Sequence, residues 1–338
     1  MRQKGRMMSL ARLKGLLIST LMFFSVQMLS KIEGYKLEKM KKFYNDLPVL
    51  VTGGAGFIGS HITHKLVELG AKVTVIDDLS SGKIENIENV IDKVIFVKKS
   101  VVDKDACLEA TKDKAVVFHL AAFISVPKSM KYPEECHKVN VNGISNLLEA
   151  ARINKVERFV FSSSSSVYGP VIGKCREDLK CNPQSPYGMS KLIGELYCQQ
   201  YAKSFGVKTV ALRYFNVYGE RQNPSGEYAA VVAKFRRLMK DNLPLPVFGD
   251  GLQTRDFTPV ERVVEANLTL AMLDKTRMNG QPFNIGMGNS INIFQLIHKL
   301  KKEFPKYSNN FVLMPARPGD VRDSCADCSK YESININF

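Results

Sequence analysis

Short apolar runs alternate with longer amphipathic stretches along most of the chain, from about residue 46 onward. Runs rich in valine, isoleucine and phenylalanine predict strands at Val49–Thr52, Lys72–Ile76, Val94–Val97, Ala115–His119, Arg158–Ser162 and Thr209–Arg213. Stretches with apolar residues at helical spacing predict helices over Gly59–Leu69, Asn140–Ile153 and Lys191–Phe205. In the last of these helices, Glu195 is expected to face water. Regular alternation of strand and helix predicts an α/β protein with a doubly wound parallel sheet of Rossmann type.

The pattern changes after Gly219, where prolines and glycines gather and helices are predicted at Ala229–Lys240 and Val263–Leu273. This part of the sequence predicts a second, smaller lobe of mixed structure. We therefore expect three parts, namely an extension over residues 1–42, a larger domain over 43–218 and a smaller lobe over 219–338.

The first 42 residues differ from the rest in charge and in apolar content. They hold ten lysines and arginines against two acidic residues, and this net charge of +8 is more than half of the chain's +15. Residues 15–30 carry no charge, but the stretch is shorter than the roughly 20 residues of a membrane-spanning helix. The extension is compatible with a wrongly assigned translation start ahead of Met40, a membrane anchor or an export signal. We expect a cytoplasmic protein, with weak membrane association through residues 15–30 as an open alternative.

The composition as a whole is that of a soluble globular protein, with 45% hydrophobic and 24% charged residues. The body has no basic tract with interleaved aromatic residues, so we expect no binding to nucleic acid. The seven cysteines are an odd number without framework spacing, which indicates reduced thiols. Cys325 and Cys328 form a lone C-x-x-C pair, and we expect no metal site because a second pair is missing.

Three glycines, Gly53, Gly56 and Gly59, follow the first predicted strand and precede a predicted helix. Glycines in this G-x-x-G-x-x-G arrangement permit a tight turn and let backbone N–H groups approach the pyrophosphate of a dinucleotide. The next strand ends at Asp77, 24 residues after Gly53, near the spacing at which a carboxylate binds the adenosine ribose hydroxyls. Because a carboxylate repels a 2′-phosphate, the sequence predicts NAD rather than NADP.

A tyrosine and a lysine at helical spacing form the candidate catalytic pair. Tyr187 and Lys191 are four residues apart, which places both side chains on one face of a helix. A nearby ammonium favours the phenolate, so Lys191 is expected to lower the pKa of Tyr187 and to make the phenol a general base for an alcohol. Two predicted strands end in small or hydroxylic residues, at 119–122 and 162–166, where ligands bind in sheets of this kind.

Several motifs together resemble those of the extended short-chain dehydrogenases/reductases. TGGAGFIG, HLAA, SSSSSVYG, YGMSK, LRYFNVYG, QTRDFTPV and RPGDV occur here in the order seen in that family. The likeness covers residues 48 to about 330 and is closest to the NAD-dependent 4-epimerases of UDP-glucose and UDP-N-acetylglucosamine. It implies an NAD-binding domain over 43–218, a nucleotide-sugar-binding lobe over 219–338 and a homodimer.

The resemblance also implies a set of site residues. Tyr187 corresponds to the general base, Lys191 to its electrostatic partner and Ser164 to the hydroxyl that bridges substrate O4 and the tyrosine. The implied cofactor shell is Gly53, Gly56, Phe57, Ile58, Gly59, Asp77, Ala121, Ala122, Lys191 and Tyr214 with Phe215. The implied UDP-sugar shell is Ser129, Ser164, Ser166, Asn216, Arg255, Arg317, Asp320 and Ser324.

The implied reaction takes hydride from sugar C4 onto NAD⁺ while Tyr187 removes the O4 proton, then returns the hydride to the other face of the 4-keto sugar. Ser165 and Ser166 stand where dehydratases and decarboxylases of this fold carry acids, which favours epimerisation. A uronate 4-epimerase, a 4,6-dehydratase, a 4-reductase and a non-catalytic NAD-binding regulator stay open as alternatives. In the epimerases that the chain resembles, a residue in the segment RPGDVRDSCAD gates the sugar pocket, so the resemblance implies that the small Ser324 leaves room for an N-acetyl group.

The sequence also departs from that resemblance. Ser100 stands where relatives often have an aspartate, and Glu220 replaces a usual proline. The chain ends soon after residue 331, so the smaller lobe is expected to be short at its C-terminus.

Overall fold

The computed structural model describes residues 34–224, 230–316 and 321–335. The chain divides into two units, residues 1–44 and 45–338, and in the first of them residues 34–44 form one helix. None of the helices in the described ranges combines the length and the apolar character needed to cross a membrane. The apolar stretch 15–30, named above as an alternative membrane anchor, lies outside these ranges.

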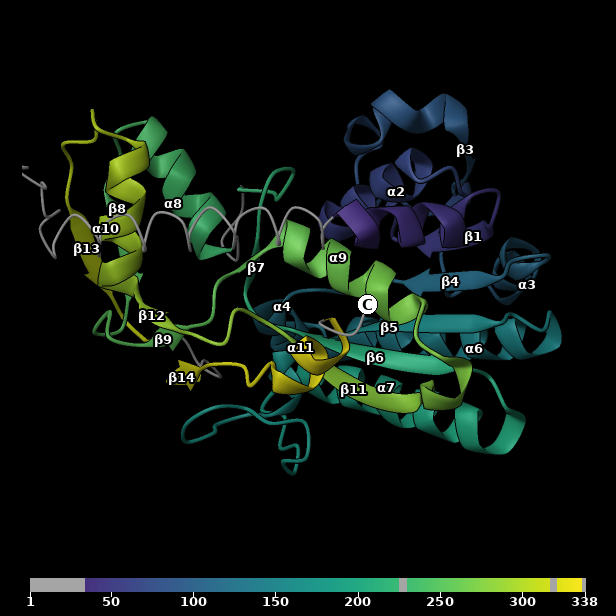
Figure 1. The fold of residues 1–338 in the computed structure, drawn as a ribbon. Helices are drawn as coiled ribbons and strands as arrows, with labels where there is room; N and C mark the ends of the chain where they lie inside the picture. The colour runs from purple at the N-terminus through teal and green to yellow at the C-terminus, as the bar shows by residue number, and fades with distance from the viewer. Residues whose placement is uncertain (1–33, 225–229, 317–320, 336–338) are drawn as a thin grey trace, which may run out of the picture. The chain divides into compact units, whose positions relative to one another are not determined.

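Seven parallel strands form the central sheet of the second unit, in the order β11-β6-β5-β4-β1-β2-β3 (Figure 1). The strands are β1 (Pro48–Thr52), β2 (Lys72–Ile76), β3 (Val94–Val97), β4 (Val116–His119), β5 (Arg158–Ser164), β6 (Thr209–Tyr214) and β11 (Asn279–Ile285). Every residue of β4 and β6 is buried, because helices cover both faces of a parallel sheet. Burial on both faces explains the apolar runs Val116–Phe118 and Val210–Leu212 within these strands. The predicted α/β sheet is confirmed.

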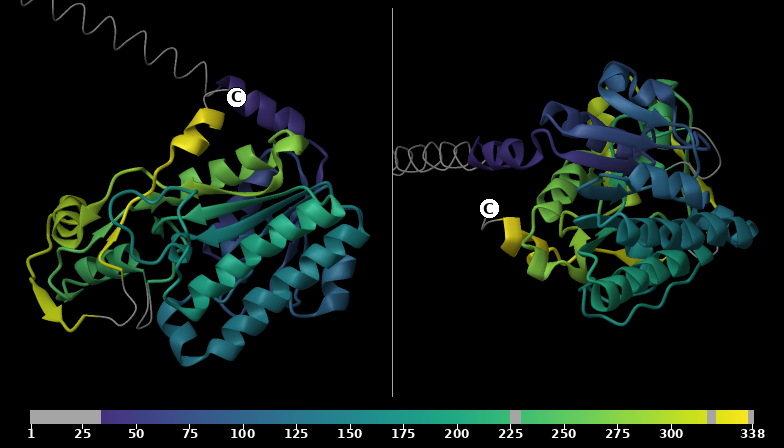
Figure 2. Two further views of the ribbon diagram at one scale, coloured as in Figure 1. Left: turned by 90° about the horizontal axis from the view of Figure 1, so that it is seen from below. Right: turned by 90° about the vertical axis from the view of Figure 1, so that its right-hand side faces the viewer.

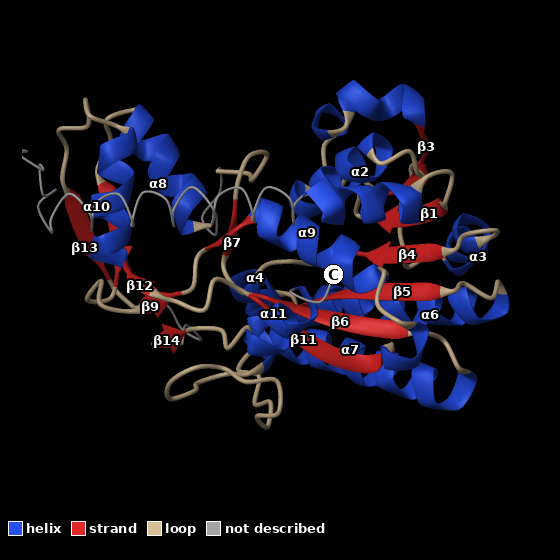
Figure 3. Cartoon of the chain, viewed as in Figure 1, coloured by secondary structure: helices blue, strands red, loops and turns tan. Residues whose placement is uncertain are grey.

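Helices lie on both faces of this sheet, as Figures 2 and 3 show from three directions. On one face α2 (Phe57–Glu68) packs against α9 (Val260–Ala271). On the other face α6 (Gly143–Ile153) lies between α3 (Lys104–Thr111) and α7 (Pro186–Phe205). The strand order reverses between β1 and β4, and the carboxyl ends there form the crevice in which such sheets bind ligands.

Helix α7 begins five residues earlier than predicted. Ser185 caps it by accepting a hydrogen bond from the Gly188 N–H group, and Pro186 fits the first helical position because its missing N–H is not needed there. The expectation that Glu195 faces water is wrong, because its carboxylate is buried against the guanidinium of Arg213.

Several short elements connect the strands and helices of the sheet domain. After β4 the chain forms α4 (Val126–Lys131), α5 (Pro133–His137) and a π-helical turn over Lys138–Asn142 that runs into α6. The 3₁₀ turns are Ile84–Asn86, Glu88–Lys93, Ser165–Val167 and Lys275–Arg277.

The smaller lobe has its own apolar core between two helices and a two-stranded sheet. Helices α8 (Val231–Lys240) and α10 (Ile293–Glu303) bury residues at helical spacing, such as Ile293, Leu296, Ile297 and Leu300. The remaining elements are β8 (Leu245–Phe248) with β13 (Phe311–Met314), β12 (Ile291–Asn292) with β9 (Thr254–Arg255) and β14 (Asp323–Ser324), β7 (Val217–Tyr218) with β10 (Thr258–Pro259), and α11 (Ser329–Asn335).

Two elements from beyond residue 218 belong with the central sheet. β11 is one of its strands, and α9 packs against β5, β6 and β11. The division at that residue stays a prediction.

Candidate active site

A cavity of about 380 Å³ lies at the carboxyl ends of the central strands. Its size is typical of small-molecule sites. The residues predicted for the site that line it are Gly53, Gly56, Phe57, Ile58, Gly59, Asp77, Ala121, Ala122, Ser164, Ser166, Tyr187, Lys191, Tyr214 and Asn216. One cavity therefore contains both the glycine turn and the candidate catalytic pair.

The glycine turn has no room for side chains. Gly53 has φ +68°, and a Cβ atom there would lie 2.7 Å from the backbone nitrogen of Ala121. A Cβ atom on Gly59 would lie 2.0 Å from the carbonyl oxygen of Gly53. No side chain caps the first turn of α2, which begins after Gly56, so its N–H groups can bind an anion. This cradle fits the pyrophosphate of a dinucleotide.

Two carboxylates follow β2 at one end of the cavity. Asp77 accepts hydrogen bonds from the N–H groups of Ala55 and Leu79, both at 2.9 Å, and burial raises its pKa despite these bonds. Burial acts in the same direction on Asp78, but hydrogen bonds from Ser80 and Ser100 outweigh it and lower the pKa of Asp78. Two adjacent carboxylates oppose the binding of a 2′-phosphate, in line with the predicted preference for NAD.

Tyr187, Ser164 and Lys191 meet at the wall of the cavity. The phenol of Tyr187 is hydrogen-bonded to Ser164, and the Lys191 ammonium lies 5.8 Å from the centre of the tyrosine ring. Lys191 Nζ donates to the carbonyl oxygen of Ser162 at 2.8 Å. The α7 spacing and the end of β5 therefore bring an acid–base group, a hydroxyl and a cation to one place.

The pKa values of this pair differ from the expectation. Burial raises the pKa of Tyr187 to about 12, and the hydrogen bond from Ser164 offsets only part of this rise. Burial also lowers the pKa of Lys191 to about 8. The prediction that Lys191 lowers the pKa of Tyr187 is therefore wrong for the protein without cofactor, because desolvation of the phenolate outweighs the help of neighbouring groups.

Four of the described residues predicted for the site, namely Ser129, Phe215, Arg255 and Ser324, do not line the cavity. Phe215 is fully buried against Tyr168, in an apolar cluster, while its neighbours on either side line the cavity. Arg255 of β9 and Ser324 of β14 pair with each other in register within the smaller lobe. Arg317 and Asp320 fall outside the described residues.

Ser129 is also absent from the cavity wall. It is completely buried, its hydroxyl donates to the carbonyl oxygen of Val126 at 2.7 Å, and it accepts from the Tyr187 N–H group at 3.1 Å.

Sequence reasoning missed several residues that line the cavity, among them Ile124, Val126, Val139, Val217, Gln222 and Lys99. Most are apolar residues in the segments that follow β4 and β6, and no motif distinguishes them. The position of Lys99 just after β3 was a usable signal, because β3 adjoins β2 and its carboxyl end meets the same crevice.

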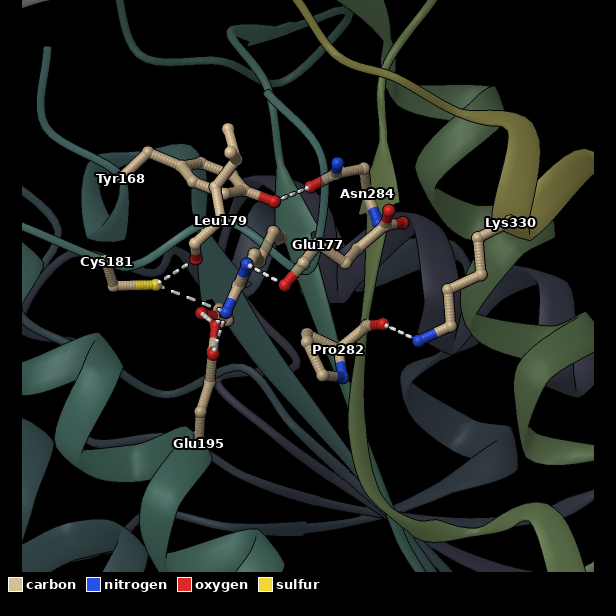
Figure 4. Close-up of polar contacts among 10 residues, drawn as sticks. Tyr168, Glu177, Leu179, Cys181, Glu195, Pro282, Asn284 and Lys330 are labelled. Atoms are coloured by element: carbon tan, nitrogen blue, oxygen red, sulfur yellow. Dashed lines mark hydrogen bonds and ion pairs between the residues drawn. The ribbon is translucent and has the colours of Figure 1, made fainter. Parts of the chain in front are cut away.

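A buried ion pair supports the serine-rich end of β5 from behind. Arg213 of β6 makes two hydrogen bonds to Glu195 of α7, at 2.9 and 2.7 Å, and Ser163 donates to the same carboxylate. Figure 4 shows the Cys181 thiol and the Glu195 carboxylate directed toward one place from two segments of the chain, while the Tyr168 hydroxyl reaches the side chain of Asn284. The guanidinium also lies 4.7 Å from the centre of the Tyr168 ring. Loss of either charge would leave the other unpaired in the interior.

Comparison with known proteins agrees with this geometry. A model of the NAD-dependent epimerase/dehydratase family matches residues 49–286. The UDP-glucose 4-epimerase of Mycolicibacterium smegmatis is 39% identical over 290 residues, which cover 84% of this chain and 91% of that protein. A UDP-N-acetyl-alpha-D-glucosaminuronate decarboxylase of Bacillus cytotoxicus is 34% identical over 304 residues, which cover 85% of this chain and 93% of that one.

Among solved structures, a UDP-N-acetylglucosamine 4-epimerase from Methanobrevibacter ruminantium M1 in complex with UDP-N-acetylmuramic acid superimposes with a TM-score of 0.81. It is 38% identical, and the match covers 86% of this chain and 92% of that one. The glycine cradle, the tyrosine–lysine pair and these matches lead to one conclusion, which confirms the predicted family and cofactor. This chain belongs to the NAD-dependent epimerase/dehydratase family, within the extended short-chain dehydrogenases/reductases.

Proposed function

We propose that this chain is an NAD-dependent 4-epimerase of a UDP-sugar, acting through a transient 4-keto sugar. The observation that carries the proposal is the make-up of the cavity wall around Tyr187. Its neighbours there are hydroxyls and one cation, and among the described residues that line the cavity the only carboxylates are Asp77 and Asp78, which follow β2. Elimination or decarboxylation needs a further acid–base group beside the tyrosine, whereas epimerisation does not.

Different residues lining the cavity bind the cofactor and act on the sugar. The glycine turn and Asp77 hold the dinucleotide, and Lys191 is placed to hold its second ribose. NAD⁺, when bound, supplies the hydride acceptor, and its positive ring favours the phenolate of Tyr187. Tyr187 then takes the proton from the sugar hydroxyl, and the Ser164 hydroxyl orients both oxygens.

The substrate side of the proposal rests on the smaller lobe. Asn216 lines the cavity, and Arg255 pairs in register with Ser324 between the short strands β9 and β14. We assign Arg255, with Arg317 and Asp320, to the uridine diphosphate, since a guanidinium fork suits phosphate oxygens. The small Ser324 favours UDP-GlcNAc and UDP-GalNAc over UDP-glucose and UDP-galactose. The homodimer and the cytoplasmic location stay predictions.

The test is turnover of a panel of UDP-sugars by purified protein without added cofactor, followed at the C4 proton by NMR. We expect interconversion of C4 epimers, and loss of at least a hundredfold in kcat for Tyr187→Phe with cofactor content unchanged. Tyr201→Phe is the matched control, because it removes a tyrosine hydroxyl from the same helix at a site bonded to Glu149. Full activity of Tyr187→Phe, loss of water from the sugar, release of carbon dioxide or net consumption of NADH would each refute the proposal.

A further inference from the structure

The backbone of Tyr187 is held at both its N–H and its carbonyl group, and different residues hold the two. The N–H group belongs to the first turn of α7, where donors have no partner within the helix. Ser185 caps the Gly188 N–H group at 3.1 Å, but it does not serve Tyr187. The hydroxyl of Ser129, from α4, accepts the Tyr187 N–H group instead, at 3.1 Å. A residue 58 positions earlier therefore completes the cap of the catalytic helix.

The hydroxyl of Ser129 has no proton left to donate to a sugar, and no surface at which a sugar could reach it. Its proton goes to the carbonyl oxygen of Val126 at 2.7 Å, and the residue has no exposed surface. This arrangement is incompatible with the substrate contact that the family resemblance implied for Ser129.

The carbonyl group of Tyr187 is tied to the same part of the chain by a second route. Ser190 donates its hydroxyl to the Tyr187 carbonyl oxygen at 2.8 Å, and Asn140 donates its side-chain amide to the Ser190 hydroxyl, also at 2.8 Å. The Asn140 side chain also bonds both backbone groups of Phe123, accepting at 2.7 Å and donating at 3.1 Å. Asn140 is buried within the π-helical turn, a type of element that is frequent at functional sites.

The two routes enclose the stretch of chain that forms one wall of the cavity. Leu120, Ala121, Ala122, Ile124 and Val126 line it, between the end of β4 and the start of α4. Phe123 is bonded to Asn140 in the middle of this stretch, and Val126 is bonded to Ser129 at its end. The wall and the backbone of Tyr187 are thus joined by two short hydrogen-bonded chains.

We propose that Ser129 is a positioning residue, and that it acts together with Ser190 and Asn140. These residues fix the backbone of the catalytic tyrosine to this wall, so that the base keeps a constant position relative to the wall of the cavity. The inference rests on the proposed function, because it assigns Tyr187 the role of base. It moves Ser129 from contact with the substrate to support of the tyrosine backbone.

The experiment compares Ser129→Ala with Thr111→Val in the whole protein with its bound cofactor. Thr111 is a matched control, since its buried hydroxyl likewise donates to its own helix, to Cys107 at 2.8 Å, and accepts from a neighbouring element, from Asn154 at 2.9 Å. We expect Ser129→Ala to lower kcat roughly tenfold, with KM for the UDP-sugar and cofactor content within twofold of the wild type. Hydrogen exchange of the Tyr187 amide should speed up roughly tenfold, and Thr111→Val should alter neither quantity.

A rise in KM with unchanged kcat would overturn the proposal, because it would return Ser129 to contact with the sugar. Unchanged exchange at Tyr187 would also overturn it. If Ser129→Ala does not fold, Ser190→Ala takes its place, with the same expected fall in kcat. If the wild type turns over no UDP-sugar, the proposed function fails, while the exchange measurement still decides whether Ser129 holds the Tyr187 backbone.

Discussion

Replacement of Lys191 by methionine is expected to make the cofactor-free protein more stable at pH 7. The lysine is buried, with 4% of its surface exposed, and burial lowers its pKa from 10.5 to about 8. A fall of this size in the pKa means that the charged lysine destabilises the folded protein by about 3 kcal/mol. Methionine has a similar stem without the charge, but it loses the hydrogen bond to Ser162, which is worth about 1–2 kcal/mol. The variant should therefore gain about 1–2 kcal/mol.

The pH dependence of this gain follows from proton binding. In the unfolded chain the lysine keeps its proton up to about pH 10.5, whereas in the folded protein it releases the proton near pH 8. Between these values the unfolded state binds more protons, so the stability of the wild type rises with pH. The advantage of Lys191→Met should thus be greatest below pH 8 and should disappear before about pH 10.5.

Urea or thermal unfolding of cofactor-free protein from pH 7 to pH 10 measures the effect. A gain of 1–2 kcal/mol raises Tm by roughly 2–3 °C in a unit of this size, because the entropy of unfolding grows with chain length. Lys203→Met is the control, since this lysine lies on the same helix with its side chain exposed. The reasoning is refuted if Lys191→Met is less stable than the wild type at pH 7, or if the difference between them stays constant with pH. Under the proposed function the same variant should also have lost epimerase activity, because the role proposed for Lys191 needs its charge.

Three further substitutions test the cofactor cradle and the buried ion pair. Gly59→Ala places a Cβ atom 2.0 Å from the Gly53 carbonyl oxygen, so calorimetry should find NAD binding lost, and binding at wild-type strength would contradict the geometry. In the same titration, Asp77→Ala should lower the affinity for NAD at least about tenfold relative to the affinity for NADP, an effect worth about 1.4 kcal/mol. An unchanged ratio of the two affinities would exclude Asp77 as the group that discriminates between them. Glu195→Gln should lower the free energy of unfolding in urea by about 3–5 kcal/mol, because it leaves the buried Arg213 unpaired. Its control is Arg152→Gln, in the exposed pair with Glu149, which should lower it by less than about 1 kcal/mol. Equal losses in these last two variants would show that burial does not matter.

The strands and the glycine turn could be predicted because their causes are local in the sequence. The fully buried β4 contains the apolar run Val116–Phe118. Gly53 is required by its positive φ, and Gly59 by a close contact within its own turn. The start of α7 was also readable from Ser185 and Pro186, which together form a cap followed by a first-turn proline.

Orientation was harder to predict than position. Phe215 shares a motif with two cavity residues, but backbone alternation at the end of β6 turns it to the opposite side, into the core. Side chains alternate between the two sides of an extended chain, and applying this rule to residues 214–216 would have assigned Tyr214 and Asn216, but not Phe215, to the cavity. The burial of Ser129 could not be predicted in this way, because its hydrogen-bond partner, the Tyr187 N–H group, lies 58 residues away.

Glu195 shows why the serine run and the catalytic helix belong to one feature. Tyr187, Lys191 and Glu195 are spaced by four residues, so they form one stripe along α7, and this stripe lies against the end of β5. Each polar group of the stripe bonds a different residue of the strand, in order Ser164, Ser162 and Ser163. The serines of the strand therefore have assigned partners, and the run is more than a polar loop that faces a ligand. A helix that presents a phenol, an ammonium and a carboxylate to a sheet needs hydroxyls and a carbonyl group opposite them, because a buried polar group without a partner is costly. The polar stripe of α7 thus accounts for the hydroxyls of Ser163 and Ser164, whereas Ser162 serves Lys191 through its backbone carbonyl group.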